Sequence, residues 1–382
     1  MSAGLTIVAT GDLVLETSDP ARLLEPTAGI LRAADVAIGQ LEIPHTEHAE
    51  VTSSDVPALP GDPAALAAVR SAGFDVLTMA GNHVADFGSA GVLDTRRHAE
   101  AAGLVVAGAG ANLDEASRPA IVERGGRTVA VFSYNCVGPR ETWAGSMKAG
   151  GAWVRVITHY EPQGANPGGP PEVYTFAERT SLDRMRADIG RAVADGHVVV
   201  VALHKGLVHV PARLADYEFE VSRAAIDAGA SAVIGHHAHL MRGVELYRGA
   251  PIFHGLGNFA TVTRALGGAA DDAPERREWA ERRRVLFGFE PDPAMPEYPF
   301  HPESRNTAIA VLDVDERGRV TPALIPCWID DTARPVPVGR GDDGDRVADY
   351  LRRITTVARL GTTLHWDGDR LAVRSEDGRM SA

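Results

Sequence analysis

The chain has 382 residues, of which 45% are hydrophobic and 23% are charged. This composition is typical of a folded globular protein and excludes a wholly disordered one. The 38 basic and 51 acidic residues give a net charge of −13. That charge argues against binding along a nucleic acid, because phosphate backbones are bound by clustered Lys and Arg. The 40 glycines and 24 prolines show no G-X-Y repeat, so we expect them in turns and loops.

The start of the chain carries no basic residue before Arg22, and its apolar run is interrupted at Asp12. This is not the pattern of a secretory signal. The longest apolar run, Val198 to Leu203, is far shorter than the roughly 20 residues of a membrane span. We therefore expect a cytoplasmic protein. Cys136 and Cys327 form no C-x-x-C pair, so two free buried thiols are expected, with a single disulfide as the alternative.

The first part of the chain alternates short β-branched runs with amphipathic stretches. This alternation predicts an α/β protein built of βαβ units around a largely parallel or mixed sheet. Strands are expected at 5–10, 36–41, 76–79 and 104–106, and helices at 20–33, 62–71 and 90–102.

The remaining elements include three hairpins and several helices. Hairpins are expected at 120–134, 244–254 and 307–326, helices at 181–194, 214–228, 275–284 and 345–359, strands at 197–203 and 232–234, and a small β-unit at 362–373. Two long segments, about 136–175 and 261–305, are expected to be irregular inserts, and long loops of this kind often cover or bind a ligand. We expect one domain over 1–330 and a C-terminal extension, 331–382, packed on it.

Polar residues follow five of the predicted strands. Ligand sites in open α/β sheets lie beyond the carboxyl ends of the strands, so these side chains are expected to meet at one edge. Carboxylates and imidazoles are also the ligands that borderline divalent metals prefer. The residues are Asp12, Glu42, Asn82, His83, Asp86, His204, His236, His237 and His239.

Each of these residues also has a plainer interpretation when it is taken alone. Asp12 could cap a helix, Glu42 could be a solvated charge, and His204 could be a core histidine. Three imidazoles within four positions are harder to pack without a shared partner. Because His237 and His239 are alternate residues, they would share one face of an extended segment. Taken together, the residues favour a metal site.

In this order and spacing, the motifs resemble those of the capsule-synthesis or poly-γ-glutamate-synthesis CapA family, a branch of the calcineurin-like metallophosphoesterase fold. The family pattern runs G-D, N-L-E, N-N-H-x-x-D-x-G, H-W-G-x-E, G-H-H-P-H and S-L-G-N-F. The corresponding segments here are 11–12, 40–42, 81–88, 204–208, 235–239 and 255–259, within about residues 5–260. The chain departs from the pattern at Gln40 and Lys205, where the family has Asn and Trp, and it lacks the Glu of the fourth motif.

The resemblance implies a two-sheet sandwich flanked by helices, with two divalent metal ions, Mn, Fe or Zn, between the sheets. It implies that Glu42 bridges the two metals. The other implied ligands are Asp12, Asn82, His204, His237 and His239. The first motif of the superfamily, D-x-H, is incomplete here, because Val14 stands where the histidine would be. His236 could replace that histidine as a metal ligand.

The resemblance further implies that a metal-bound hydroxide is the nucleophile. His83 is then the candidate general acid, with Asp86 or Glu42 orienting its ring. The alternatives are a purely structural role for His83 and a helix cap for Asp86. Lys205, His209 and Arg242 are expected beside the metals, where they would bind the substrate, with surface charge as the alternative for the two basic residues.

Three functions remain open on this reading. The first is a metal-dependent hydrolase of a small anionic phosphoester. The second acts on an amide of the γ-glutamyl type, as hydrolase or transferase. The third is a non-catalytic partner in polymer synthesis, which the full set of polar residues disfavours. The net charge of −13 disfavours a long polyanion, so we expect a small anionic substrate, with neither nucleic acid nor membrane as a partner.

Overall fold

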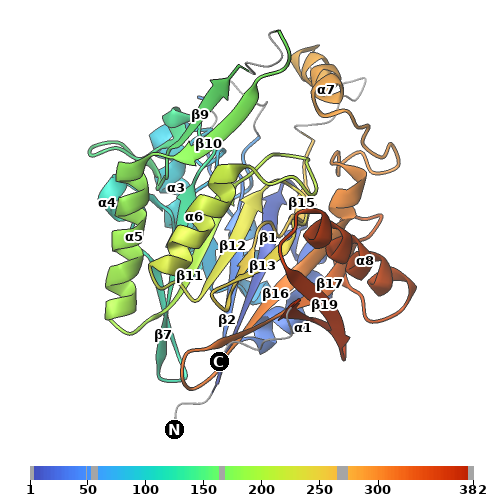
Figure 1. Ribbon diagram of the computed structural model, residues 1–382. Helices are drawn as coiled ribbons and strands as arrows, with labels where there is room; N and C mark the ends of the chain where they lie inside the picture. Colours follow the sequence, from blue (N-terminus) through green and yellow to red (C-terminus); the bar gives the residue numbers. More distant parts are fainter. Residues whose placement is uncertain (1–3, 49, 53–58, 163–167, 265–273, 377–382) are drawn as a thin grey trace.

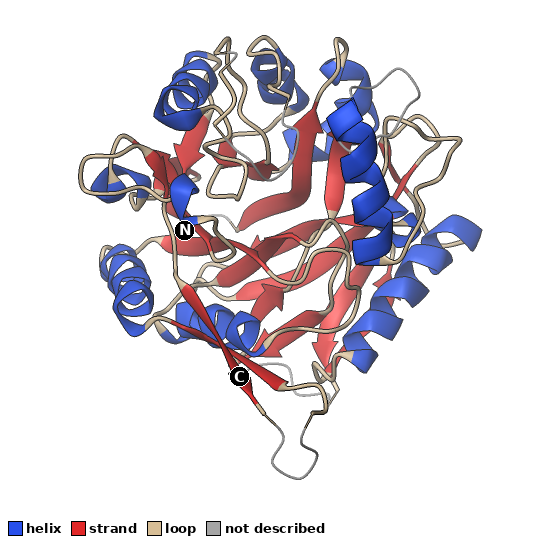
Figure 2. Cartoon of the chain, turned by 90° about the horizontal axis from the view of Figure 1, so that it is seen from above, coloured by secondary structure: helices blue, strands red, loops and turns tan. Residues whose placement is uncertain are grey.

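Two β-sheets face each other in the computed structural model, and helices cover their outer faces (Figures 1 and 2). The structure describes residues 4–48, 50–52, 59–162, 168–264 and 274–376. Seen from above, the strands fill the centre and most helices surround them (Figure 2). The expected fold class, an α/β two-sheet sandwich flanked by helices, is confirmed.

The larger sheet is mixed, and its strands β1 to β4 run parallel. In spatial order it contains β19 (Thr362–Asp367), β20 (Arg370–Ser375), β17 (Val320–Ile329), β16 (Asn306–Val314), β1 (Leu5–Leu15), β2 (Val36–Leu41), β3 (Val76–Thr78) and β4 (Val105–Ala107). Two further strands pair outside this order, β15 (Asn258–Val262) with β1 and β18 (Pro335–Pro337) with β17.

The smaller sheet contains four parallel strands, β7, β11, β12 and β14, with an antiparallel strand at each edge. In spatial order it contains β13 (Val244–Tyr247), β14 (Ala250–Phe253), β12 (Ala232–His237), β11 (Val198–Lys205), β7 (Arg127–Asn135) and β6 (Ala120–Arg124). The predicted hairpins β6–β7, β13–β14 and β16–β17 are confirmed.

The apolar side chains form three layers of core. Between the sheets, Ile7 and Ile38 pack in the same buried cluster as Val200 and Ile234 of the opposite sheet. The outer face of the larger sheet is covered by α1 (Pro20–Ala33), α2 (Ala65–Ala72) and α3 (Gly88–Ala101). The outer face of the smaller sheet is covered by α5 (Arg179–Ala194) and α6 (Asp216–Asp227). The remaining helices are α4 (Leu113–Ala116), α7 (Pro274–Phe287) and α8 (Asp342–Val357).

Strand β1 is longer than the sequence predicts. It continues through Asp12 to Leu15, because after residue 9 it leaves β16 and pairs in parallel with β15. Gly11 permits this switch, since a Cβ at that position would lie 2.0 Å from the carbonyl oxygen of Gly257. Asp12 therefore lies inside a strand and not after it. In the smaller sheet, β11 and β12 likewise extend far enough to include His204 and the first two histidines of the G-H-H motif.

The segment 136–175 is more regular than predicted. It contains the 3₁₀ helix η1 (Arg140–Thr142), the short strand β8 (Gly150–Gly151) paired with β5 (Ala109–Gly110), and the hairpin of β9 (Val156–Glu161) and β10 (Glu172–Ala177). The sequence does not predict these elements, because they are stabilised by contacts between separate parts of the chain and not by a local hydrophobic pattern. Trp143 and Trp153, for example, stack with ring centroids 4.6 Å apart.

The second insert contains the predicted charged helix, α7, and the 3₁₀ helix η2 (Pro302–Arg305). Its residues 265–273 lie outside the described part of the chain. In Figure 1, α7 and the β9–β10 hairpin both stand at the upper end of the sandwich, at the end toward which β1, β11 and β12 run.

The described part of the C-terminal segment, residues 331–376, is hydrogen-bonded into the larger sheet. Both β18 and β20 pair with β17, and β19 extends the sheet beyond β20. Helix α8 adds Val347 and Leu351 to the core between the sheets.

Both cysteines are free and buried, as the sequence predicts. None of the helices in the described ranges is long and apolar enough to cross a membrane.

Candidate metal centre

The carboxyl ends of the parallel strands of both sheets bring all six predicted metal ligands to one place. β1 carries Asp12, Glu42 follows β2, and Asn82 follows β3. From the smaller sheet come His204 in β11, His237 at the end of β12, and His239 two residues later. Asp12, Glu42 and His204 are at most 2% exposed, so the centre lies below the protein surface.

Four of these predicted ligands form one group. Side-chain donor atoms of Glu42, His204 and His237 lie within 4.8 Å of one another. Asn82 joins them, because its Oδ1 lies 2.7 Å from His204 Nε2 and 3.2 Å from His237 Nδ1. Two imidazoles, a carboxylate and an amide oxygen that converge in this way suit one borderline divalent cation.

The other two predicted ligands form a second group beside the first. Asp12 Oδ2 lies 3.4 Å from His239 Nδ1. Asn258 belongs to the same group, since its Oδ1 lies 2.8 Å from that nitrogen. The sequence reasoning did not assign Asn258 a role, although it lies in the 255–259 motif and pairs in register with Asp12.

Glu42 links the two groups electrostatically. Burial, and then the neighbouring Asp12, raise the pKa of Glu42 to about 7. Glu42 in turn counteracts the effect of burial, which lowers the pKa of His239. Glu42 thus contacts His204 of the first group, with Oε1 3.5 Å from Nε2, and interacts electrostatically with both Asp12 and His239 of the second.

The two carboxylates contact imidazoles at 3.4 and 3.5 Å but accept no hydrogen bond from the described residues. All four carboxylate oxygens of Asp12 and Glu42 are buried without a hydrogen bond. Burial raises the pKa of Asp12 to about 8. An uncompensated buried carboxylate is costly, whereas a bound cation would reverse the cost. The residues present therefore fit divalent cations.

The imidazoles are held in the form that binds metal. Burial lowers the pKa of His237 to about 3 and holds that of His204 well below its usual value. A neutral ring offers a lone pair to a cation, and a protonated ring does not.

The histidine motif after β12 does not adopt the expected backbone. His237 and His239 have φ angles of +88° and +53°, so they do not share one face of an extended segment, and that prediction is wrong. Left-handed conformations are costly for side chains with a Cβ and are concentrated at functional sites. His236, a suggested replacement ligand, instead lies with Nε2 3.1 Å from the carbonyl oxygen of Thr10, across the gap between the sheets.

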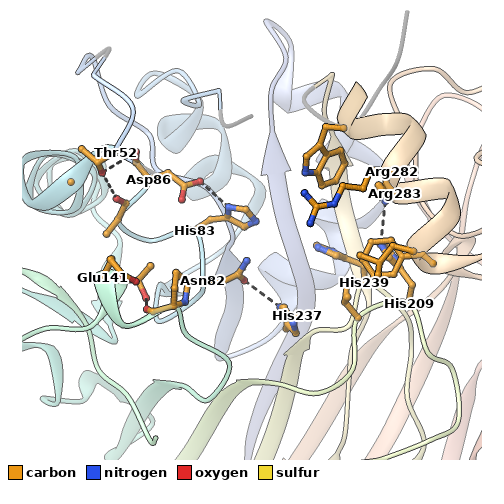
Figure 3. A pocket seen from close by; sticks show the side chains of 18 of the residues that line it. Thr52, Asn82, His83, Asp86, Glu141, His209, His237, His239, Arg282 and Arg283 are labelled. Carbon is orange, nitrogen blue, oxygen red and sulfur yellow. Dashed lines mark hydrogen bonds and ion pairs between the residues drawn. The ribbon is translucent and has the colours of Figure 1, made fainter. Parts of the chain in front are cut away.

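His83 and Asp86 lie above the two groups, on the wall of a pocket. His83 Nδ1 lies 2.8 Å from Asp86 Oδ2, and Asp86 is 1% exposed. The alternative of a helix cap fails for Asp86, because α3 begins after Phe87 and no side chain caps it. The carboxylate orients the imidazole, and Figure 3 shows the ring of His83 directed into the pocket.

The pocket has a volume of about 1050 Å³ and opens onto the metal centre. One wall carries His83, Asp86 and Glu141, and the other carries His209, His239, Arg282 and Arg283 (Figure 3). The predicted irregular inserts both contribute to its lining, through residues 139–149 and through α7.

Two of the three residues predicted to bind substrate do not reach this pocket. Lys205 and Arg242 are fully buried, and both pair with Glu218 of α6, at 3.3 and 3.6 Å. Lys205 follows His204 in a strand, and successive side chains of a strand point to opposite faces. His204 therefore faces the other sheet while Lys205 faces α6.

His209 does line the pocket, but it contacts other side chains there. Its ring stacks on that of His239 with centroids 5.7 Å apart. Its Nε2 accepts a hydrogen bond from Arg283 Nη2 at 3.1 Å. Arg283 and its neighbour Arg282 were missed by the sequence reasoning, since nothing in a charged helical segment separates a buried arginine from the exposed ones.

Comparisons with known proteins agree on a family. The model of the family "Bacterial capsule synthesis protein PGA_cap" matches residues 6–263. A probable polyglutamine synthesis accessory protein of Mycobacterium tuberculosis is 30% identical over 62% of this chain and 55% of its own. The PGA biosynthesis protein CapA of Bacillus subtilis is 28% identical over 60% and 54%. The uncharacterized protein y4sH of Sinorhizobium fredii is 27% identical over 67% and 66%.

The chain thus spans between about half and two thirds of the length of these relatives. Among solved structures, it is similar to a putative 5'-nucleotidase from Staphylococcus aureus, with 12% identity over 92% of this chain and 58% of that one and a TM-score of 0.45. The calcineurin-like phosphoesterase YfkN from Bacillus subtilis has 12% identity over 94% and 98%, with a TM-score of 0.37. With the family model matched over residues 6–263, the chain belongs to the bacterial capsule synthesis protein PGA_cap family.

Proposed function

We propose that the protein is a metal-dependent hydrolase with a dinuclear centre, acting on a small anionic phosphoester. The observation that carries this proposal is the pair of buried carboxylates, Asp12 and Glu42, whose oxygens have no hydrogen-bond partner in the described part of the chain. Three imidazoles and two amides surround them, and the pocket above holds an oriented histidine, His83.

When bound, divalent cations at this centre would activate water as the nucleophile and neutralise negative charge on the substrate. The six ligands, from Asp12 to His239, would hold them. His83 would donate a proton to the leaving group, since its ring is directed into the pocket. Asp86 would keep the Nδ1 proton in place and stabilise the charged form of the ring.

A second candidate is hydrolysis or transfer at an amide of the γ-glutamyl type. The printed names of two relatives, which refer to PGA biosynthesis and polyglutamine synthesis, favour this candidate. The same activated water and the same histidine would serve acyl chemistry. The third candidate, a non-catalytic partner in polymer synthesis, requires neither a metal nor an acid.

The metal content tests the centre directly. Protein purified without chelator is expected to contain up to two divalent ions per chain, and Asp12→Asn is expected to lose at least one of them. His83→Gln is expected to keep the metal and to lose about 10²–10⁴-fold in kcat. His159→Gln, at a histidine that is more than half exposed, is the control and should change neither quantity.

The choice of substrate is tested with p-nitrophenyl phosphate, bis-p-nitrophenyl phosphate and γ-glutamyl-p-nitroanilide. Metal-dependent cleavage of a phosphate supports the first candidate, and cleavage confined to the anilide replaces it with the second. If the protein contains no metal and neither substitution alters any activity, the chain is not a metal-dependent hydrolase.

A further inference from the structure

Helix α7 places a buried arginine on the wall of the pocket. Arg283 is 5% exposed. Its Nη1 donates a hydrogen bond to the carbonyl oxygen of Pro299 at 2.6 Å, and its Nη2 donates one to His209 Nε2 at 3.1 Å. A guanidinium has five N–H donors, so these two bonds leave others available.

Neither of the acceptors carries a negative charge. One is a backbone carbonyl, and the other is an imidazole that accepts the bond through its unprotonated nitrogen. Across the described residues no carboxylate lies within ion-pair distance of Arg283, whereas Arg242, which is also buried, has Glu218 at 3.6 Å. Burial lowers the pKa of Arg283 to about 10, which still leaves it charged at neutral pH.

Aromatic rings surround the guanidinium of Arg283. The carbon at its centre lies 5.5 Å from the ring centroid of Phe289, 5.6 Å from that of Trp279 and 5.8 Å from that of Phe300. Such contacts stabilise a cation but do not neutralise it. A buried cation without a counter-ion is costly, so an anion in the pocket would compensate it.

Arg283 lies close to the metal centre, on the wall of the pocket that also carries Arg282. His209 joins them, since it accepts from Arg283 and stacks on the metal ligand His239. The exposed Arg282 lines the same wall and has no ion-pair partner among the described residues. In Figure 3 the acidic residues Asp86 and Glu141 lie on the opposite wall.

We propose that Arg283, assisted by Arg282, binds an oxyanion of the substrate, either a carboxylate or a phosphate group, next to the bond that is broken. The planar fork of a guanidinium matches both groups. This inference rests on the proposed function and names the recognition element of the same site. Since α7 lies outside residues 6–263, the element is not part of the region that the family model matches.

The test is calorimetric titration of the metal-loaded full chain with inorganic phosphate and, separately, with glutarate. Arg283→Gln is expected to weaken binding about tenfold or more. Arg284→Gln is the matched control, because Arg284 is the next residue, is exposed and pairs with Glu281 at 3.2 Å. The control should stay within about twofold of the wild type. A loss for phosphate assigns a phosphate group, and a loss for glutarate assigns a carboxylate.

Unchanged affinity of Arg283→Gln for both anions would overturn the proposal. Melting temperature and metal content are measured on the same samples. If Arg283→Gln melts at a much lower temperature than the wild type, the variant of the exposed residue, Arg282→Gln, is used instead. Its affinity for the anion is expected to fall about threefold, and an unchanged affinity would overturn the proposal.

The activity of the same variants separates this inference from the proposed function. Arg283-dependent anion binding by a protein that cleaves none of the test substrates supports the anion site and rejects the hydrolase. Cleavage of p-nitrophenyl phosphate with the same KM in the wild type and in Arg283→Gln supports the hydrolase and rejects the anion site.

Discussion

Two neighbouring residues of β11, His204 and Lys205, point to opposite faces of the sheet, and each lies beside a buried carboxylate. His204 faces the metal centre, and Lys205 faces α6, where Glu218 also meets Arg242. Burial alone would raise the pKa of Glu218, but Lys205 and Arg242, together with the backbone N–H of Ala215 and with His254, outweigh burial and lower it. Lys205 Nζ also lies 3.1 Å from His254 Nδ1. One carboxylate therefore balances two buried cations directly behind the ligands.

Glu218→Gln should destabilise the protein by about 3–5 kcal/mol, because it leaves two buried cations without their counter-charge. The free energy of unfolding from urea titration measures this change. Glu100→Gln is the control, since Glu100 is half exposed and pairs with Arg96, so its removal should cost at most about 1 kcal/mol. A loss of less than about 1 kcal/mol for Glu218→Gln would contradict the role assigned to the cluster.

The sequence predicted the residues of the metal centre better than those of the pocket. Asp12, Glu42, Asn82 and His204 follow from motif order, because parallel strands deliver their carboxyl ends to one edge. Lys205 was expected beside them, since the sequence shows that it follows His204 but not on which face of the strand it lies. Arg283 could not be identified, because its burial depends on side chains that are distant in sequence, such as His209 and Phe300.

At the level of elements, the decisive feature is the close approach of β1 to the loop before β15. Gly11 has no side chain between its own backbone and the carbonyl oxygens of Leu256 and Gly257. The backbone N–H of the next residue, Asp12, donates a hydrogen bond to the carbonyl oxygen of Gly257 at 2.8 Å. The position of this predicted metal ligand therefore depends on a contact between two backbones.

Gly11→Ala should displace β1 from this loop and reduce both stability and metal content. The new Cβ would lie 2.0 Å from the oxygen of Gly257, so a backbone must move. Gly29→Ala is the matched control, because Gly29 lies within α1 with no atom near the added Cβ, and it should raise stability by about 0.5–1 kcal/mol.

Melting temperature and bound metal, measured by mass spectrometry, report on both glycine variants. If Gly11→Ala keeps the wild-type melting temperature and metal content, the close approach does not position Asp12.

The elements themselves were predicted unevenly. Helix α1 and strand β2 have the predicted bounds. Each lies between residues that favour turns, and each has a hydrophobic pattern that is clear within its own sequence. The end of β1 was missed because its partner, β15, is about 250 residues away and was not predicted as a strand. Helix α2 begins at Ala65, later than its predicted cap at Asp62, although Asp62 Oδ1 does accept from Ala64 N at 2.8 Å.

At the scale of the whole molecule, burial of histidines away from the metal makes stability depend on pH. Burial lowers the pKa of His45 to about 4. Burial, and then the neighbouring Lys205, lower that of His254 to about 4 as well, against the opposing effects of Glu245 and Glu218. Both residues are fully buried. The pKa of a histidine in the unfolded chain is about 6.5.

Between pH 6.5 and 4 the unfolded chain therefore binds protons that the folded chain does not, so stability should fall as the pH is lowered. Each histidine contributes on the order of 3 kcal/mol to this loss by pH 4. Urea unfolding of metal-loaded protein at pH 7, 5.5 and 4.5 measures the slope. His45→Gln should flatten it, and the exposed His159→Gln should not. A slope that is the same in all three proteins would refute the assignment.

The pairing of β1 also has a consequence for the order in which the molecule is made. β1 precedes the other strands of the described chain, but its neighbours in the larger sheet include β15 and β16, which end at Val262 and Val314. Contacts between residues so distant in sequence form slowly, and a strand left waiting for them is exposed meanwhile. Because Asn258 pairs in register with Asp12, the group of Asp12, His239 and Asn258 is complete only after β15 has joined the sheet. The proposed divalent ions would therefore bind only after the sheet has closed.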